Sequence, residues 1–342
     1  MAIYWIPYLY FFLLSGFAKL KQSALRNALI MIGATWLFAV AALRNDVDND
    51  FESYKYLFEL IDPININSNY FDRDYLVYFE PGFFYLVSVL KLVSSNLEFA
   101  TTAFLSIAIW AYVFFKYSAY PAVSFFLYTC FSFYLHEFTQ IRFGLAIAIG
   151  FLGLCLWREG IKKRALLLFA LSTTFHYAAV FFFVAPLWAK FTASKRFIIG
   201  LAVFVLGLYA FNVFGSVMDR LIAIGGLDSR LEFYSNNDDD AASVSPILII
   251  LNFIILIYMV VVKKKEDKNL YFESIYLLSF SFLCLFSQFD IMRRLSMLFN
   301  PAIYIIVPDL IKDRKLFYAY PVFGLYTIIF ISRLDILRPY AI

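Results

Sequence analysis

Long runs of apolar residues that contain no charge constrain this chain more than any other feature. Two examples are Ala2–Ala18, near the N-terminus, and Ile247–Val262, in the second half. Such runs approach the length of about 17–25 residues that crosses the hydrocarbon layer of a bilayer. The chain is 63% hydrophobic and 16% charged, whereas soluble domains are about 45–50% apolar and about 25% charged. We therefore predict an all-α polytopic bundle of transmembrane helices, because a backbone in lipid satisfies its hydrogen bonds only as a helix or a closed barrel, and the sequence shows no ten-residue strands of alternating hydrophobicity.

The apolar segments are spread over the whole chain and leave two longer polar stretches between them. At about 20 residues per crossing, the pattern predicts about 10–13 membrane helices, some short or re-entrant, in a single integral membrane domain over residues 1–342. The polar stretches, 44–80 and 214–245, are predicted loops. The apolar segments lie at residues 2–18, 28–43, 81–95, 98–116, 119–135, 142–157, 165–188, 197–213, 246–262, 270–287, 295–308 and 317–331.

Clusters of Lys and Arg indicate which side of the membrane each loop faces. Cytoplasmic loops are enriched in these residues, and the clusters lie at 19–26, 158–164, 190–196, 263–268 and 312–315. The loops 44–80 and 214–245 are instead rich in Asp and Glu, and we predict that both face outward. Because the net charge of +4 is scattered between apolar segments, it indicates no nucleic-acid partner.

Two apolar segments cannot be simple single crossings if all the basic loops face the cytoplasm. Four segments separate the outward loop 44–80 from the basic loop 158–164, where an odd number of crossings is required. The short segment 81–95 is therefore predicted to be interfacial or re-entrant. The segment 165–188 has basic loops on both sides and is predicted to be a helical hairpin with its bend near His176.

The stretch after the second apolar segment combines one arginine with a series of acidic residues, Arg44-Asn-Asp46-Val-Asp48-Asn-Asp50-Phe-Glu52-Ser-Tyr54. A calcium loop would need Gly at its sixth and Glu at its twelfth position, where Phe51 and Leu57 stand. One interpretation is a solvated loop with Arg44 snorkelling at a helix end. The other is a site at the membrane surface, where Arg44 binds an anionic ligand and a carboxylate acts as a base.

Further arginines are predicted on the same outward face. Arg142 follows Gln140 at the head of an apolar helix, and Arg293 and Arg294 stand at the outer end of another, while Arg230 belongs to the outer acidic loop. Each could simply anchor a helix to lipid head groups. Charged side chains at membrane depth, however, tend to face the interior of a bundle, and guanidinium groups are forked donors suited to phosphate. The group therefore suggests a lipid-linked phosphate or pyrophosphate ligand.

His176 lies inside an apolar segment, in Thr173-Thr174-Phe175-His176-Tyr177. It is either a hydrogen-bonded structural residue or a proton acceptor. The chain has two histidines, and the cysteines Cys130, Cys155 and Cys284 are dispersed, so a zinc site of the usual composition is not expected. We predict neither a metal nor a cofactor.

Several of these elements, in their order along the chain, resemble the EpsG-like and Wzy-type polymerases of bacterial surface polysaccharides. The family pattern begins with an Arg that closes the second helix, followed by Gly, Asp and Tyr. A Glu-Pro-Gly-aromatic element, an Arg at the head of a small-residue helix, a Phe-His pair and a late outward Arg come next. The matching residues are Arg44, Asp48 in place of the Gly, Asp50, Tyr54, Glu80-Pro81-Gly82-Phe83, Gln140-Ile-Arg142, Phe175-His176 and Arg294-Leu295.

The resemblance implies a glycosyltransferase C-like fold and a metal-independent glycosyltransferase of the bacterial inner membrane, with its active face in the periplasm. Such enzymes move a growing glycan from undecaprenyl pyrophosphate onto the next lipid-linked repeat unit, and so build O-antigen of lipopolysaccharide or capsule-type polysaccharide. The implied partners are undecaprenyl-pyrophosphate-linked donor and acceptor glycans, membrane lipids and a chain-length regulator protein. The implied catalytic residues are Asp50, His176, Arg142 and Arg294, and the implied substrate- or pyrophosphate-binding residues are Arg44, Tyr54, Glu80, Gln140, Arg230 and Arg293.

Other classes of protein fit parts of the pattern. A flippase or transporter of the same lipid-linked units would carry internal repeats with matching broken helices, and no such duplication is visible in the sequence. A membrane acyltransferase that modifies the glycan could use His176 as its base but would leave the arginines unexplained. Another lipid-linked glycosyltransferase or ligase is a closer alternative.

Overall fold

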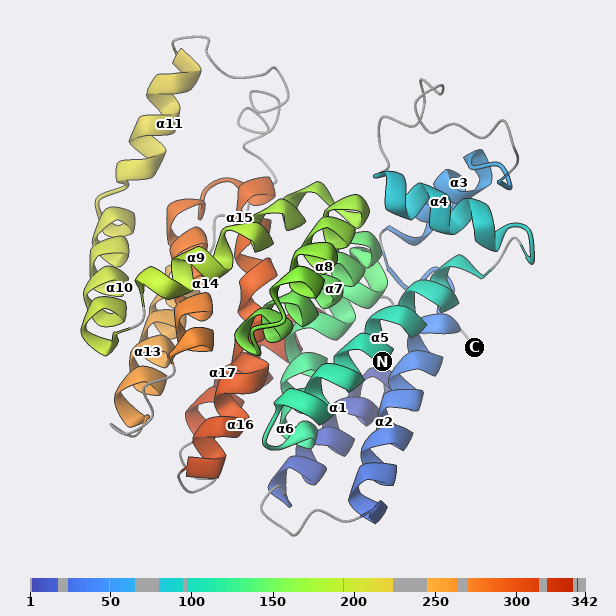
Figure 1. Ribbon diagram of the computed structural model, residues 1–342, viewed down its shortest axis with the longest axis horizontal. Helices are drawn as coiled ribbons and strands as arrows, with labels where there is room; N and C mark the ends of the chain where they lie inside the picture. The colour runs from blue at the N-terminus through green and yellow to red at the C-terminus, as the bar shows by residue number, and fades with distance from the viewer. Residues whose placement is uncertain are drawn as a thin grey trace. The chain divides into compact units, whose positions relative to one another are not determined.

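The computed structural model describes residues 2–17, 24–48, 50–64, 80–94, 97–192, 194–223, 245–263, 270–313, 319–334 and 337. Helices dominate these ranges (Figure 1), and the strand-like pairing found within them is one isolated antiparallel bridge between Asp48 and Leu337. The all-α prediction is therefore confirmed for the part of the chain that is described.

Residue contacts divide the chain into two compact units. Unit 1 comprises Met1–Phe183 and Val307–Ile342, and unit 2 comprises Val184–Ile306. The boundary at Ile306 falls inside the helix α16 (Ile303–Asp313). That both units belong to one integral membrane domain stays a prediction.

Unit 1 is built around α7 (Ile141–Arg158), which packs against α5, α8 and the short elements η4 and η5. Close packing here depends on glycine. A Cβ added at Gly150 would lie 2.1 Å from the Phe182 ring, and one added at Gly144 would lie 2.7 Å from the His136 Cβ. The other elements of unit 1 are α1 (Ala2–Gly16), α2 (Ala24–Ala42), α3 (Phe51–Leu60), α4 (Pro81–Leu90), α5 (Glu98–Tyr117), α6 (Pro121–Tyr128), the π-helical η3 (Thr129–Phe133) and η4 (Leu135–Thr139), α8 (Lys162–Phe175), the 3-10 helix η5 (Tyr177–Phe183) and α17 (Tyr320–Leu334).

Unit 2 is organised by α14 (Tyr271–Leu285), which contacts α9, α10, α13 and α15. Polar contacts are concentrated at one end of α14, where Glu273 pairs with Lys263 and where the Trp188 indole donates to the Ser274 carbonyl at 2.9 Å. The remaining elements are α9 (Ala185–Phe191), α10 (Lys195–Ala210), α11 (Val213–Ala223), α13 (Pro246–Val262), α15 (Asp290–Phe299) and the 3-10 helix η6 (Asn300–Ala302).

Four stretches of helix in the described ranges are long and apolar enough to cross a membrane, namely Ala24–Ala42, Glu98–Tyr117, Ile141–Arg158 and Arg293–Lys312. Seven shorter apolar helices accompany them in the same ranges. Among the shorter ones, α4 has 10 residues and is about 15 Å long at about 1.5 Å per residue. That is half of the hydrocarbon layer, so α4 cannot cross alone, which agrees with the interfacial or re-entrant segment expected at 81–95. Its topology stays a prediction.

The predicted bend near His176 is found. Helix α8 ends at Phe175, and His176 is extended, with φ −159° and ψ 124°. The following η5 packs back on α8, where the rings of Phe169 and Phe182 stack with centroids 6.1 Å apart. The segment 165–188 therefore contains a helical turn-back, and its topology in the membrane stays a prediction.

Helices α3 and α4 lie together beside the ends of α2 and α5 in unit 1 (Figure 1). Helix α3 lies within the stretch 44–80 that was predicted as a loop, and it buries Phe51, Tyr54 and Phe58 on one face. Helix α4 begins with Pro81 after the extended residue Glu80. Proline suits the first position of a helix, because the N–H that it lacks would have no partner within the helix. This start fixes Glu80 just outside α4.

Candidate functional site

The first charged cluster of unit 1 forms where α2 ends. The Arg44 side chain is completely buried and donates a short hydrogen bond from Nη1 to the Glu137 carbonyl oxygen. The same nitrogen lies 3.9 Å from Oδ2 of Asp48, whose side chain is also inaccessible. The Arg44 guanidinium carbon is 4.3 Å from the centroid of the Phe99 ring and 5.4 Å from that of Phe138. Cation, carboxylate and aromatic rings thus compensate one another in the interior.

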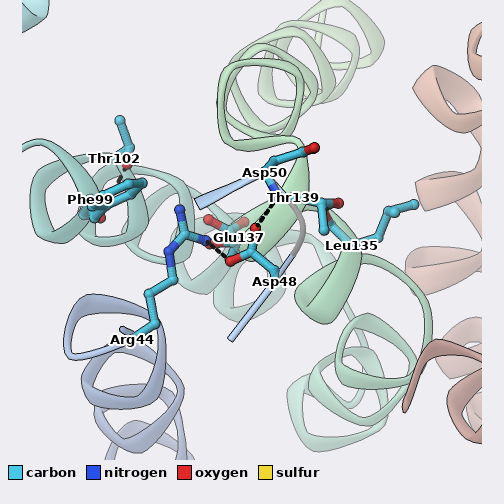
Figure 2. Close-up of polar contacts among 8 residues, drawn as sticks. All are labelled: Arg44, Asp48, Asp50, Phe99, Thr102, Leu135, Glu137 and Thr139. Carbon is cyan, nitrogen blue, oxygen red and sulfur yellow. Dashed lines mark hydrogen bonds and ion pairs between the residues drawn. The ribbon is translucent and has the colours of Figure 1, made fainter. Parts of the chain in front are cut away.

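The carboxylate that lies next to the Arg44 guanidinium is that of Asp48. Its Oδ1 accepts a hydrogen bond of 3.1 Å from the Asp50 backbone nitrogen, so that its carboxylate lies between the Arg44 guanidinium and the Asp50 backbone (Figure 2). Burial raises the pKa of the Asp48 carboxyl, and the neighbouring Arg44 charge opposes this rise. The residue that departs from the family pattern is therefore the counter-ion of Arg44.

Glu137 completes this cluster and was not among the residues selected from the sequence. It is fully buried, and its Oε1 accepts hydrogen bonds from Ser106 at 2.6 Å and from Tyr128 at 2.8 Å. Glu137 lies in η4, between the apolar stretches 121–133 and 141–158. Burial raises the pKa of its carboxyl to about 7, against the lowering effect of both hydrogen bonds and of Arg44. The sequence feature that could have identified Glu137 is an acidic residue in the short gap between two apolar segments.

The second charged cluster pairs Arg142 with Glu80. Nη1 of Arg142 donates to Oε2 of Glu80 at 2.7 Å, and the two side chains are 22% and 8% exposed. Arg142 stands in the first turn of α7, directly after Gln140 ends the π-helical run. Its guanidinium carbon lies 5.9 Å from the Tyr54 ring centroid. Burial raises the pKa of the Tyr54 phenol, and the hydrogen-bonded Arg142 guanidinium opposes this rise.

Aromatic side chains connect the two charged clusters. The Phe58 ring lies 5.0 Å from Phe99 and 6.0 Å from Phe83, and Tyr54 lies 6.5 Å from Phe99 (centroid distances). Arg44 is next to Phe99, and Arg142 is 6.0 Å from the Phe83 ring centroid. The structure therefore brings the predicted site residues Arg44, Asp50, Tyr54, Glu80 and Arg142 into one region of unit 1.

His176 is joined to this region by close packing. A Cβ added at Gly82, two residues after Glu80, would lie 2.3 Å from the Thr174 hydroxyl oxygen, so the Glu-Pro-Gly element touches the end of α8. The half-buried His176 ring lies 4.7 Å from the Phe143 ring centroid, and its Nδ1 accepts a hydrogen bond of 3.3 Å from the Ala178 backbone nitrogen. Phe143 is adjacent to Arg142, so His176 belongs to the same neighbourhood.

Gln140 precedes α7 and is only partly buried. Its carbonyl oxygen accepts from the Gly144 backbone nitrogen at 2.8 Å, which helps to begin the helix that carries Arg142. Its side-chain Oε1 is buried and has no hydrogen-bond partner among the described residues. Gln140 thus combines a structural contact with a side chain available to a ligand.

The remaining predicted site residues do not belong to unit 1. Arg293 and Arg294 belong to α15 of unit 2, where Arg293 is half-buried and Arg294 is exposed. Arg230 lies outside the described residues. A common cluster of all five arginines stays a prediction. In the ranges that the structure covers, His, Cys, Asp and Glu form no group of three that could hold a metal ion, and metal independence stays a prediction as well.

The fold and the site define a helical membrane protein that gathers arginines, carboxylates and aromatic rings between its helix ends. The chain belongs to the EpsG family, whose model matches residues 27–341, nearly the whole chain. The resemblance drawn from the motifs is thereby confirmed, and the family makes this chain a membrane glycosyltransferase of polysaccharide polymerisation. No curated protein and no solved structure matches it.

Proposed function

We propose that this chain polymerises oligosaccharide repeat units linked to undecaprenyl pyrophosphate, without a metal, at the periplasmic face of the bacterial inner membrane. The product is O-antigen or capsule-type polysaccharide. The observation that carries the proposal is the position of Arg142, a partly exposed guanidinium that Glu80 holds by one nitrogen at 2.7 Å. A planar fork of N–H donors matches phosphate oxygens, and the leaving group of this reaction is a pyrophosphate.

The reaction needs charge stabilisation at the leaving group. A hydroxyl oxygen of the acceptor glycan attacks the anomeric carbon of the donor, and a new glycosidic bond forms while the bond from that carbon to the pyrophosphate oxygen breaks. Undecaprenyl pyrophosphate leaves with the electron pair, and the acceptor hydroxyl loses its proton. Negative charge grows on the leaving oxygen, and a fixed guanidinium in a dry site stabilises that charge. The ion pair with Glu80 and the aromatic neighbours support this role for Arg142.

Asp50 and His176 are the candidate side chains to accept the proton of the acceptor hydroxyl. Because Nδ1 of His176 already accepts from the Ala178 N–H, the neutral imidazole carries its own hydrogen on Nε2. That nitrogen is then a hydrogen-bond donor to a ligand, not a base. Asp50 is half-buried at the start of α3, and its backbone is fixed by Asp48. Asp50 is therefore the favoured base.

Reconstitution tests the proposal directly. The purified chain in nanodiscs, supplied with lipid-linked repeat units from a strain that cannot polymerise them, should give a polymer ladder and release undecaprenyl pyrophosphate in the presence of EDTA. Asp50→Asn should still bind the donor lipid but make no polymer, whereas the matched variant Asp46→Asn, at an exposed position of the same loop, should act like wild type. Movement of the lipid-linked unit across vesicles without glycan lengthening would replace the proposal with a flippase.

The membrane side of the site needs a separate measurement. The acidic loops are expected outside, and Ser68 and Ser235 stand in them. Cysteines introduced at these two positions should react with a membrane-impermeant thiol reagent in intact spheroplasts. Labelling that requires lysis would move the proposed site to the cytoplasmic face.

A further inference from the structure

A cavity of about 350 Å³ lies next to the Arg44 cluster in unit 1. The end of α2, one side of α3, the end of α4 and the start of α5 line it. Small-molecule sites in proteins have volumes of about 300–1,000 Å³. The cavity is thus large enough for a ligand.

The lining of this cavity mixes charges of both signs with an aromatic wall. Arg44, Lys55 and Lys91 supply cations, Glu59 and Glu98 supply carboxylates, and Phe58 belongs to the wall. Lys91 also donates from its ammonium group to the Ile61 carbonyl oxygen, which fixes its position. Hydrogen-bond donors and acceptors therefore face the same space.

Two of the lining side chains are buried with polar atoms that lack partners. Oε1 of Glu98, a residue 1% exposed, has no hydrogen bond within the described residues. Nε and Nη2 of Arg44, a residue 5% exposed, have none there either. A buried polar group without a partner is costly, and a charged one more so. These atoms are inaccessible, so a ligand hydroxyl would meet the exposed lining residues Lys55 and Glu59, because a hydroxyl accepts from an ammonium group and donates to a carboxylate.

We propose that this cavity binds one uncharged pyranose ring of the lipid-linked glycan. Phosphate is disfavoured because Glu59 and Glu98 would repel it, and a cationic ligand is disfavoured because three cationic side chains line the same space. The hydroxyl groups of a neutral sugar can hydrogen-bond to both the cationic and the anionic side chains, and its apolar ring face can pack on the aromatic wall. The inference rests on the proposed function and names where that function holds a sugar. The pyrophosphate stays at Arg142, and the rings of Phe58 and Phe83 stand between the two places.

Direct binding tests this sugar subsite without any polymerisation. The chain in nanodiscs is titrated by saturation-transfer NMR with methyl glycosides of a hexose, a 6-deoxyhexose and an N-acetylhexosamine, and separately with inorganic pyrophosphate. Lys55→Met and Glu59→Gln change exposed lining residues of α3, so folding is preserved. Glu98→Gln changes the buried carboxylate. Glu52→Gln is the matched control, because it is exposed on the same helix and does not line the cavity.

At least one glycoside should bind wild type and Glu52→Gln equally. Its dissociation constant should rise about tenfold or more in Glu98→Gln and in Glu59→Gln, the loss expected for one hydrogen bond to a charged group. Pyrophosphate binding should not change in these variants. Absence of glycoside binding, or equal binding by all variants, overturns the subsite. Pyrophosphate binding that is lost in Lys55→Met makes the cavity an anion site instead. The polymer ladder is scored independently, so a failed subsite and a failed polymerase are distinguishable.

Discussion

Arg44 and Arg142 carry the same side chain within one unit, yet their surroundings differ. Arg44 has an inaccessible side chain that meets Asp48, the Glu137 carbonyl and two aromatic rings. Arg142 is 22% exposed and holds one carboxylate, Glu80, at 2.7 Å. Arg44 is held mainly by partners inside unit 1, whereas part of the Arg142 side chain stays exposed. On the proposed function, the difference separates a residue that organises the site from one that would contact the pyrophosphate.

The largest effect is expected from Arg44→Met. The change leaves the Asp48 carboxylate buried without its cation, and breaking a buried pair from one side costs about 3–5 kcal/mol. Thermal unfolding in detergent should show this loss, and Asp48→Asn in the same chain should restore part of it. If Arg44→Met melts like wild type while Arg142→Met does not, the assignment of the two arginines is reversed.

Arg142→Lys should reduce turnover strongly while leaving stability almost unchanged. An ammonium lacks the planar fork, and a hydrogen bond to a charged group contributes about 1.5–3 kcal/mol, so polymer formation should fall by more than about tenfold. Polymer length on gels and the melting temperature are measured on one preparation. Arg158→Lys, at the exposed far end of the same helix, is the control. Normal polymer from Arg142→Lys at normal protein level would contradict the role.

Glu137→Gln should remove a pH dependence of stability. The ordinary pKa of 4.5 is raised to about 7 in the folded chain by burial. The protonated form therefore contributes stability that is fully present below about pH 4.5 and is lost as the pH rises through about 7. The melting temperature of wild type should fall between pH 5 and pH 8 more than that of Glu137→Gln. Glu52→Gln, at an exposed site, should keep the wild-type slope, and an equal slope in all three proteins would refute a buried, protonatable Glu137.

The smallest effect is expected from Lys116→Met. Lys116 pairs with Glu159 at 2.9 Å, but the two side chains are 38% and 34% exposed. Exposed ion pairs contribute about 0–1 kcal/mol, so the melting temperature should change little, in contrast to Arg44→Met. The Lys116 contact holds the pKa of the Glu159 carboxyl below its usual range, and high salt should weaken it. If Lys116→Met lowered the melting temperature as much as Arg44→Met does, exposure would not distinguish the Lys116–Glu159 pair from the Arg44–Asp48 pair.

Much of the fold follows from apolar run length alone. The ends of α2, α5 and α7 fall close to the segments read from hydropathy, and the break at His176 was predictable from basic residues on both sides of 165–188. Helix α3 was missed because its apolar residues occupy one face of an otherwise charged stretch. The lengths of the apolar runs could not predict the division into two units either, because that division depends on which helices contact one another.

For the site, the sequence predicted residue types better than partners. Arg44, Tyr54, Glu80 and Arg142, which the shared motif selected, lie in one region of unit 1, although 98 positions separate the first and the last in the chain. That Arg142 pairs with Glu80, and Arg44 with Asp48 and the Glu137 carbonyl, depends on side-chain directions that spacing does not encode. Glu137 was missed because a single acidic residue between apolar segments looks like a short turn.

The glycines of α7 have a genetic consequence. Gly144 lies against the His136 backbone and Gly150 against the Phe182 ring, so neither position has room for a methyl group. A side chain at Gly144 would push the start of α7, two residues from Arg142, away from its neighbours. A random screen for strains that lose surface polysaccharide should therefore recover glycine replacements along this helix that touch no substrate. Such alleles would resemble site mutants in phenotype, and suppressors would be expected as smaller residues on the facing segments.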